Sequence, residues 1–143
     1  MINWLLLHYK LPAQPSARRV YVWRKLKRLG AILLNESVWI LPDTPRTAEQ
    51  FQWLAAEIQE MEGEAYLWRS GLILGIQENV LMEKFVEQVE QEYMDLLKKI
   101  NGKKPNLPEL SRKYQQIVGE DYFHSDIGKE VREKLLALRG GEA

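Results

Sequence analysis

Cysteine is absent from this 143-residue sequence, and histidine occurs only at His8 and His124. Without thiols the chain has no disulfide bonds, no thiolate metal site and no cysteine nucleophile, which fits a reducing compartment. Neither histidine has a second ligand at a metal-binding spacing such as HxxxH. Walker, GxSxG and GxGxxG motifs are also missing. We therefore expect no catalytic residues, no bound metal and no cofactor.

Long hydrophobic runs are missing as well. The apolar run at residues 4–7 is far too short to span a bilayer, and the N-terminus lacks the basic region and small-residue cleavage site of a secretory signal. The hydrophobic content of 45% is ordinary for a globular protein and argues against global disorder. We expect a cytoplasmic protein with one well-formed core and room for an appendage.

The net charge of zero conceals a strong asymmetry along the chain. Residues 1–46 carry eight basic and two acidic side chains, residues 47–95 carry two and eleven, and residues 96–143 carry ten and seven. Such a division allows the protein to present a positive face to a polyanion, or to pair its own halves in a dimer. Both interpretations stay open at this point.

The first half of the chain predicts a ferredoxin-like fold. Apolar and β-branched runs indicate strands at residues 3–10, 31–35, 37–42 and 65–68, with a tight Asn35-Glu36 turn between the second and third. Helical periodicity indicates helices at residues 17–29, with Ser16 as N-cap, and at residues 45–62. The order βαββαβ is that of an α+β, four-stranded antiparallel sheet with both helices on one face.

The second half predicts a helical extension, so we divide the chain into a ferredoxin-like domain at residues 1–75 and about three helices at residues 76–143. Helices are expected near residues 78–99, 108–118 and 126–138. Apolar residues recur along the first of them at alternating spacings of four and three. This seam packs within the chain or against a partner helix; it is made by Met82, Val86, Val89, Tyr93, Leu96 and Ile100.

The helix at residues 17–29 is the strongest candidate for contact with a partner. It contains six Arg or Lys residues, with Val22, Trp23, Leu26 and Leu29 on its apolar arc. Arg and Lys neutralise phosphates, and a tyrosine among them can stack on a base. An ordinary solvated face paired with the acidic middle of the chain explains the pattern too. The opposite, basic arc is made by Arg18, Tyr21, Arg24, Lys25 and Arg28.

The remaining polar and aromatic residues give weaker signals. His8 lies inside a strand, where packing on the sheet is the simpler interpretation. The loop EDYFHSD places His124 among carboxylates, which suits either ordinary helix capping or a metal or anion site. Most of the five tryptophans are explained by packing, although Trp39 and Trp68 form an exposed platform if their strand faces are open.

The segments WLLLHYKLPAQPSARRVYVWRKLKRLGAILLNESVWILPDT, EQFQWLAAEIQEMEGEAYLWRS and KYQQIVGEDYF resemble the N-terminal domain of ChrB, the bacterial chromate-resistance regulatory protein. The resemblance covers nearly the whole chain. It implies a chromate-responsive transcriptional regulator that binds DNA. Such proteins usually carry a second, C-terminal domain, and the resemblance implies that this chain ends where that domain would begin.

A more distant resemblance concerns Lys10. The YKLP of residues 9–12, followed by an Arg-rich helix and a hairpin, is similar to the opening of CRISPR adaptation nuclease-like proteins and of PaaX-type repressors, which share the βαββαβ core and dimerise through it. In the nuclease-like members an aspartate at this position is the proposed metal ligand. A lysine repels Mg²⁺ there, so nuclease activity would need other carboxylates, such as Glu36 or Asp43.

Together these observations predict a non-enzymatic, ChrB-like regulator that forms a homodimer and contacts DNA mainly through phosphates. The residues expected to bind nucleic acid are Lys10, Arg18, Tyr21, Arg24, Lys25 and Arg28. Chromate or another oxyanion is a further possible ligand. The alternative is a dimeric protein-interaction module whose basic helix docks on an acidic partner without nucleic acid.

Overall fold

The computed structural model describes residues 2–141, with the side chain of residue 76 excepted. The chain forms two compact units, one up to Asn79 and one from Val80 onward, and each has its own core. Within the described residues no helix is both long enough and apolar enough to cross a membrane.

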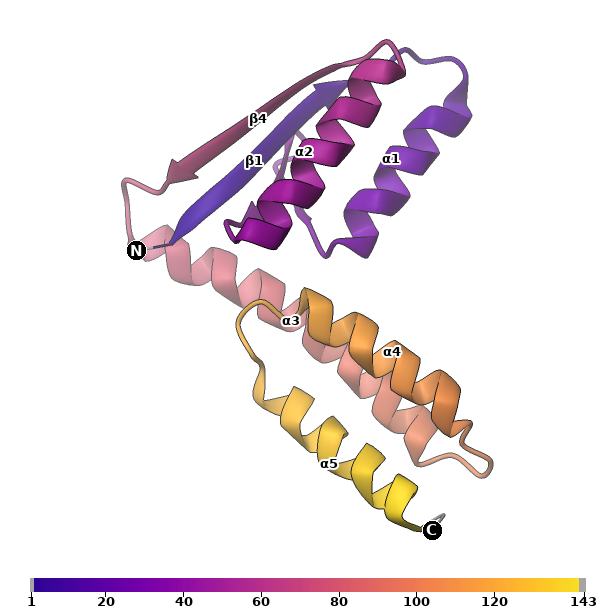
Figure 1. Ribbon diagram of the computed structural model, residues 1–143. Coiled ribbons are helices and arrows are strands. Elements are labelled where there is room, and N and C mark those ends of the chain that lie inside the picture. The colour runs from indigo at the N-terminus through magenta and orange to yellow at the C-terminus, as the bar shows by residue number, and fades with distance from the viewer. Residues whose placement is uncertain (1, 142–143) are drawn as a thin grey trace. The chain divides into compact units, whose positions relative to one another are not determined.

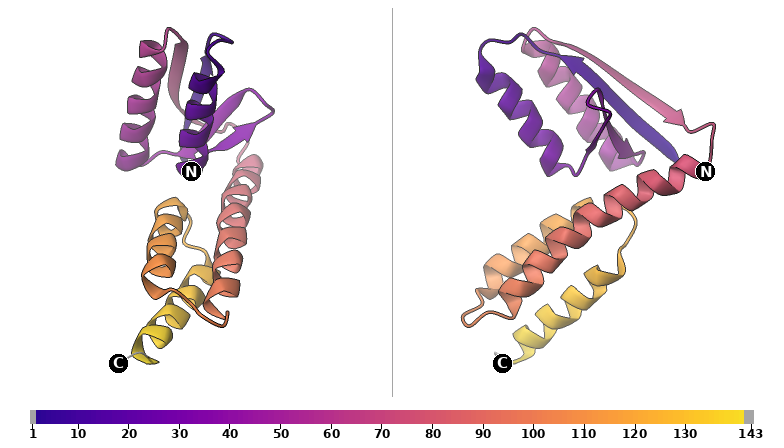
Figure 2. Two further views of the ribbon diagram at one scale, coloured as in Figure 1. Left: turned by 90° about the vertical axis from the view of Figure 1, so that its right-hand side faces the viewer. Right: turned by 180° about the vertical axis from the view of Figure 1, so that it is seen from behind.

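The first unit is the α+β fold that the sequence predicts. Four antiparallel strands form one sheet in the order β2-β3-β1-β4. Two helices lie side by side on one face of it (Figure 1 and Figure 2). The elements are β1 (Asn3–Lys10), α1 (Ser16–Arg28), β2 (Ile32–Leu34), β3 (Val38–Pro42), α2 (Pro45–Glu60) and β4 (Glu64–Gly71).

Strand register decides which side chains enter the core. Leu5 pairs with Leu41 and Leu7 pairs with Trp39, so these four side chains point to the same face. That face is covered by α1 and α2, and it supplies a core in which Leu7 and Leu41 are fully buried. Burial of this much apolar surface is the main favourable contribution to folding. The helices add Val22, Leu26, Phe51, Leu54 and Ile58.

Local signals set the ends of the elements. In the β2–β3 hairpin Asn35 and Glu36 have φ angles of 48° and 62°, as a two-residue turn of this kind requires. Thr44 caps α2 by accepting from the backbone N–H of Thr47, whose hydroxyl accepts from the N–H of Thr44 in return. The prediction of Ser16 as N-cap was wrong, because Pro15 holds that position and Ser16 begins α1.

Strand β4 is longer than the sequence pattern indicates. The apolar stretch predicts residues 65–68, whereas the strand runs from Glu64 to Gly71 and pairs with β1 over its full length. Only Ala65 and Leu67 alternate inward, and the outer residues are exposed. An edge strand of this type is held by its ladder of backbone hydrogen bonds more than by buried side chains, which is why hydrophobicity alone underestimates its length.

The second unit is helical and contains most of α3 (Ile76–Ile100), with α4 (Leu107–Glu120) and α5 (Asp126–Gly141). Its core joins residues from all three helices: Val89, Tyr93, Leu96, Ile100, Leu110, Ile117, Val131 and Leu135. Asn106 caps α4 by accepting from the N–H of Glu109 at 3.3 Å. The predicted seam of α3 therefore packs within the chain from Val89 onward.

The first half of that seam is displaced by one position. The sequence spacing predicts Met82 and Val86 as seam residues, but both are only partly buried, while Leu81 and Phe85 are buried. Phe85 makes edge contacts with the rings of Tyr122 and Phe123, which follow α4. Helix α3 has two adjacent apolar stripes in this region. Contact with Tyr122 and Phe123 buries the stripe of Leu81 and Phe85, which the alternating spacing of four and three does not predict.

Candidate nucleic-acid interface

Helix α1 turns a narrow apolar stripe inward and leaves two basic flanks. Only Val22 and Leu26 are buried on it, and both are fully inaccessible to solvent. Trp23, which periodicity places on the apolar arc, is 52% exposed and lies outside the core. The stripe is narrow because α2 lies along one flank of the helix and the β2–β3 hairpin lies near the other, so each flank has its own environment.

The flank that faces α2 contains three of the predicted contact residues. Arg18 donates to the carbonyl oxygen of Met61 at 3.0 Å. The hydroxyl of Tyr21 donates to Glu57, and the ammonium of Lys25 lies 3.4 Å from the same carboxylate. Burial opposes the charge on Lys25, but the oxygens of Tyr21 and Glu57 outweigh it and raise the pKa of Lys25. These side chains connect the two helices of the unit.

The outer surface of α1 contains cations that are free of such ties. Arg24 and Arg28 are exposed, and within the part of the chain that the structure describes neither forms an ion pair. Arg19 and Lys27 are also exposed, and the ammonium of Lys27 lies 5.9 Å from the centre of the Trp23 ring. The sequence analysis did not select Arg19 and Lys27, because it assumed a single basic arc.

Lys10 belongs to a cavity at the end of β1 that α1 and the hairpin complete. The volume of this cavity is about 370 Å³, and two cations, Lys10 and Arg19, line it with the carboxylate of Glu36. Its aromatic wall includes Tyr9 and Trp39; burial raises the pKa of Tyr9 against the opposing effects of Trp39 and Arg19. The remaining lining residues are Leu11, Trp23, Leu33 and Ser37. The structure thus brings Lys10 together with Arg19.

The two carboxylates considered as replacement metal ligands lie in different places. Glu36, in the hairpin turn, lines the cavity with Lys10, whereas Asp43 accepts from Arg69 of β4 at 2.5 Å. In residues 2–141 no group of three or more His, Asp or Glu side chains has an arrangement that could hold a metal ion.

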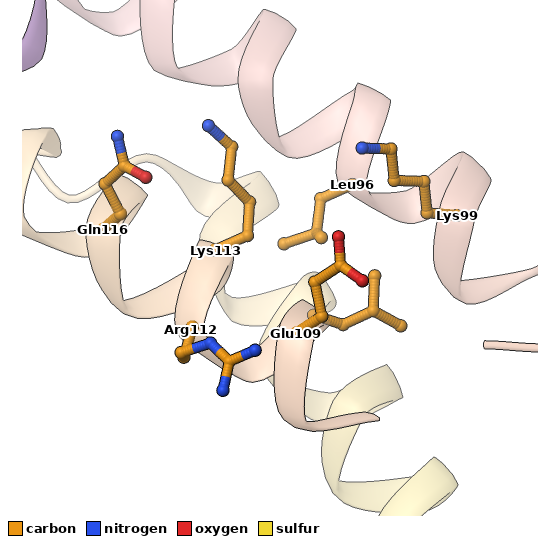
Figure 3. A pocket seen from close by; sticks show the side chains of 7 residues that line it. Leu96, Lys99, Glu109, Arg112, Lys113 and Gln116 are labelled. Carbon is orange, nitrogen blue, oxygen red and sulfur yellow. The ribbon is translucent and has the colours of Figure 1, made fainter. Parts of the chain in front are cut away.

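A second basic cluster lies in the helical unit. A hollow of about 250 Å³ between α3 and α4 is lined by Lys99, Arg112 and Lys113 together with Glu109, Gln116, Leu96 and Leu110. Figure 3 shows Lys99 coming from α3 and the other polar side chains coming from α4. Lys99 and the two cations of α4, Arg112 and Lys113, are separated in the sequence, so no local spacing reveals that they share a hollow.

Two buried groups in the helical unit have raised pKa values. Burial and the nearby carboxylate of Glu92 raise the pKa of Glu120 to about 8, and Lys113 and Gln116 only partly offset the rise. The hydroxyl of Tyr93 donates to Asp121 at 3.1 Å, and burial together with that carboxylate raises the pKa of Tyr93.

The EDYFHSD loop around His124 is held by the buried carboxylate of Asp121. Asp121 accepts from the backbone N–H and the hydroxyl of Ser125, immediately before α5 begins. His124 is exposed, with a φ angle of 52°. The hydrogen bonds of Asp121 thus give this loop a structural role at the start of α5.

The fold and the site define a class: an α+β, ferredoxin-like unit with a cation-rich first helix, joined to a helical unit. The sequence pattern described as "Protein ChrB, N-terminal" matches residues 19–120, and the chain belongs to that family. One curated relative, Protein ChrB of Cupriavidus metallidurans (strain ATCC 43123 / DSM 2839 / NBRC 102507 / CH34), is 34% identical over 64 residues. That match covers 45% of this chain and 20% of the relative. No solved structure matches the chain.

Proposed function

We propose that this chain is the DNA-contacting part of a chromate-resistance transcriptional regulator, acting in the cytoplasm without catalysing a reaction. Membership of the ChrB N-terminal family supports the regulatory class. The single observation that carries DNA contact is the exposed cationic surface of α1, made by Arg19, Arg24, Lys27 and Arg28, none of which forms an ion pair with another described residue. Guanidinium groups recognise phosphate oxygens through paired N–H donors.

The contacts of α1 divide the predicted residues by role. Arg24 and Arg28 reach solvent and serve as phosphate contacts, and Lys10 adds charge beside Arg19 at the end of β1. Arg18, Tyr21 and Lys25 are held by α2, so their main contribution is to fix the angle at which α1 meets the duplex. Binding of this kind depends on phosphates and is only weakly selective for sequence.

The test is an anisotropy titration of the full chain against duplex DNA from upstream of its own gene, repeated over a range of salt concentrations. We expect affinity to fall steeply with salt, and Arg24→Gln/Arg28→Gln to weaken binding and reduce the slope by about two, since each phosphate contact contributes roughly 0.9. Lys129→Gln/Arg132→Gln on α5 is the matched control. Absence of binding at low salt rules the proposal out.

The second candidate is a protein-interaction module that forms a dimer and binds an acidic partner surface. The observation that favours it is the contact of Tyr21 and Lys25 with Glu57, because it shows that α1 accommodates a carboxylate. Arg24→Glu/Arg28→Glu would then abolish capture of the partner protein while DNA retention stays at its baseline.

Oxyanion binding is a property that either candidate could include. The cavity at the end of β1 supplies Lys10 and Arg19 as cationic contacts for chromate or a related oxyanion. Isothermal titration with chromate, with sulfate as the comparison ion, tests it. Heat that disappears in Lys10→Gln/Arg19→Gln supports this site, and identical heat in that variant removes it.

A further inference from the structure

The face of the sheet that α1 and α2 leave uncovered contains an ordered group of aromatic rings, which we call the aromatic plate: His8, Tyr66 and Trp68. His8 of β1 pairs directly with Tyr66 of β4, and the neighbouring pair is Leu6 with Trp68. These side chains therefore project from the same face of the sheet, opposite to the face of Leu5 and Leu7. Tyr66 and Trp68 are 53% and 54% exposed.

The geometry of the plate is specific. The indole N–H of Trp68 donates to Nε2 of His8 at 2.7 Å, and the planes of the two rings are within 6° of parallel, with centroids 6.2 Å apart. The hydrogen bond and the parallel ring planes give the two side chains a fixed mutual orientation. Tyr66 stacks on His8 at 5.1 Å and 17°. Three side chains are thereby held in one orientation.

This arrangement is not explained by the core. The apolar faces of two large rings remain in solvent, while Trp4 and Trp39 of the same sheet are buried. Side chains on an exposed strand surface ordinarily keep rotamer freedom, which costs free energy to remove. Here the cross-strand hydrogen bond and ring stacking remove it before any ligand arrives, so a flat ligand would bind to a surface that is already organised.

We propose that the aromatic plate binds unpaired nucleobases of single-stranded nucleic acid by stacking. Every base has a π-face, so such a surface accepts different bases, whereas bases of a duplex already stack on one another and are not available. An antiparallel four-stranded sheet that stacks bases on aromatic side chains of its open face is a known solution for single strands.

The charges around the plate distinguish this binding from the duplex contact proposed for α1. Lys10 is opposed in register by Glu64, so this part of the sheet has little net charge. The cations of α1 lie on the other side of the sheet. Stacking should therefore supply most of the affinity, and the dependence on salt should be shallow. The inference goes beyond the proposed regulator function and does not require it.

The test uses the full chain, a short labelled oligo(dT), its oligo(rU) counterpart and an abasic oligomer of the same length. The abasic strand keeps the phosphates and removes the bases. We expect binding of both base-containing strands with a shallow salt slope, and at least about tenfold weaker binding of the abasic strand, because stacking on one aromatic ring carries most of the affinity.

Three variants identify the surface. Trp68→Ala should weaken oligo(dT) binding by about tenfold or more, and Trp68→Phe, which keeps a π-face but loses the N–H donor to His8, should fall between it and the wild type. Trp53→Ala is the matched control, since Trp53 is a 65% exposed tryptophan of α2 outside the plate. Circular dichroism and thermal melting confirm that each variant folds.

Several outcomes overturn the proposal. Equal binding of abasic and base-containing strands assigns the interaction to phosphates alone, and unchanged affinity in Trp68→Ala removes the plate. A change in sedimentation coefficient on Trp68→Ala, without any oligonucleotide binding, assigns the face to a second copy of this chain. If Arg24→Gln/Arg28→Gln loses duplex binding but still binds oligo(dT), the duplex contact of α1 and the aromatic plate act independently. Failure of this inference can then be told apart from failure of the proposed function.

Discussion

Gly63 shows how one residue permits the close approach of α2 and β1. A Cβ atom there would lie 2.6 Å from the carbonyl oxygen of Lys10, 2.8 Å from Leu11 and 2.9 Å from Ile58. All three distances are below van der Waals contact, and one of the neighbours is backbone, which cannot rotate away. The position of Lys10 therefore depends on a glycine that lies 53 residues later in the chain.

We expect Gly63→Ala to lower the free energy of unfolding by about 1–3 kcal/mol, the usual range for overpacking a rigid site. Urea unfolding followed by circular dichroism measures it. Gly75→Ala is the control, because a Cβ atom at Gly75 meets nothing within 4 Å. Equal stability of the two variants would contradict the proposed packing at Gly63.

Glu120 links stability to pH. Its pKa is raised from an ordinary value of 4.5 to about 8, so the folded protein retains a proton that the unfolded chain releases. The stability that this group contributes is complete below pH 4.5, decreases as the pH rises from there to about 8, and is constant above. Glu120→Gln, which stays neutral, should be more stable than the wild type near pH 9 and show a flatter profile in thermal melts. Parallel profiles for the two proteins would contradict this assignment.

At the scale of elements, α1 and α2 are joined by contacts that use the same groups a phosphate would use. Glu57 of α2 occupies Tyr21 and Lys25, both on α1. The ion pair is partly exposed, and pairs of this kind contribute about 0–1 kcal/mol. This polar contact between α1 and α2 is therefore weak enough to be exchanged for a contact with an anionic partner, while Val22 and Leu26 keep α1 on the core.

Glu57→Gln should have opposite effects on stability and binding. It removes the partner charge of Lys25, so we expect stability to fall by less than about 1 kcal/mol. It also frees one ammonium and removes one negative charge beside the basic surface, so duplex affinity should rise about twofold to tenfold at low salt. Glu49→Gln, also on α2, is the comparison variant. A parallel loss of stability and affinity would show that Lys25 serves only to hold the helices together.

The sequence was most informative where periodicity and turn chemistry coincide. The sequence patterns of the first unit predict its fold class correctly. These patterns are the alternating strands, the Asn35-Glu36 turn and the two helices, and the structure confirms the α+β fold that they predict. Trp23 and Trp39 were harder to assign, because strand and helix patterns show that a residue is apolar but not which neighbour covers it. Trp39 was considered for an exposed platform, yet it is 6% exposed on the helix-covered face, whereas Trp68 is open.

The candidate site shows the same limit. Charge density along α1 identifies the helix, but the division between residues tied to α2 and residues open to solvent depends on a carboxylate, Glu57, that lies 32 residues beyond Lys25. The partnership of Trp68 with His8 spans 60 residues and is set by strand register. Neither pairing has a local sequence signal, so only the folded chain reveals them.

At the scale of the whole molecule, the two units have separate cores. The cluster formed by α3, α4 and α5 includes no residue of the sheet. Gly128 of α5 lies against the ring of Tyr93 in that cluster, where a Cβ atom would meet ring atoms at 3.0 to 3.2 Å. A local packing change there should act mainly on the helical unit, because the residues of that cluster all belong to α3, α4 and α5.

We therefore expect Gly128→Ala to accelerate amide hydrogen exchange in α4 and α5 and to leave exchange in β1 and β4 unchanged. Mass spectrometry of peptic fragments resolves the two regions, and Gly63→Ala should give the reverse pattern. Equal acceleration in both regions would show that the cores unfold as one cooperative unit.

The hydrogen bond from Trp68 to His8 also dictates the tautomer of the imidazole. An indole N–H can only donate, so Nε2 of His8 must carry a lone pair, and the single ring proton resides on Nδ1. The ¹⁵N shifts of this one ring therefore report whether the cross-strand hydrogen bond of the aromatic plate is formed.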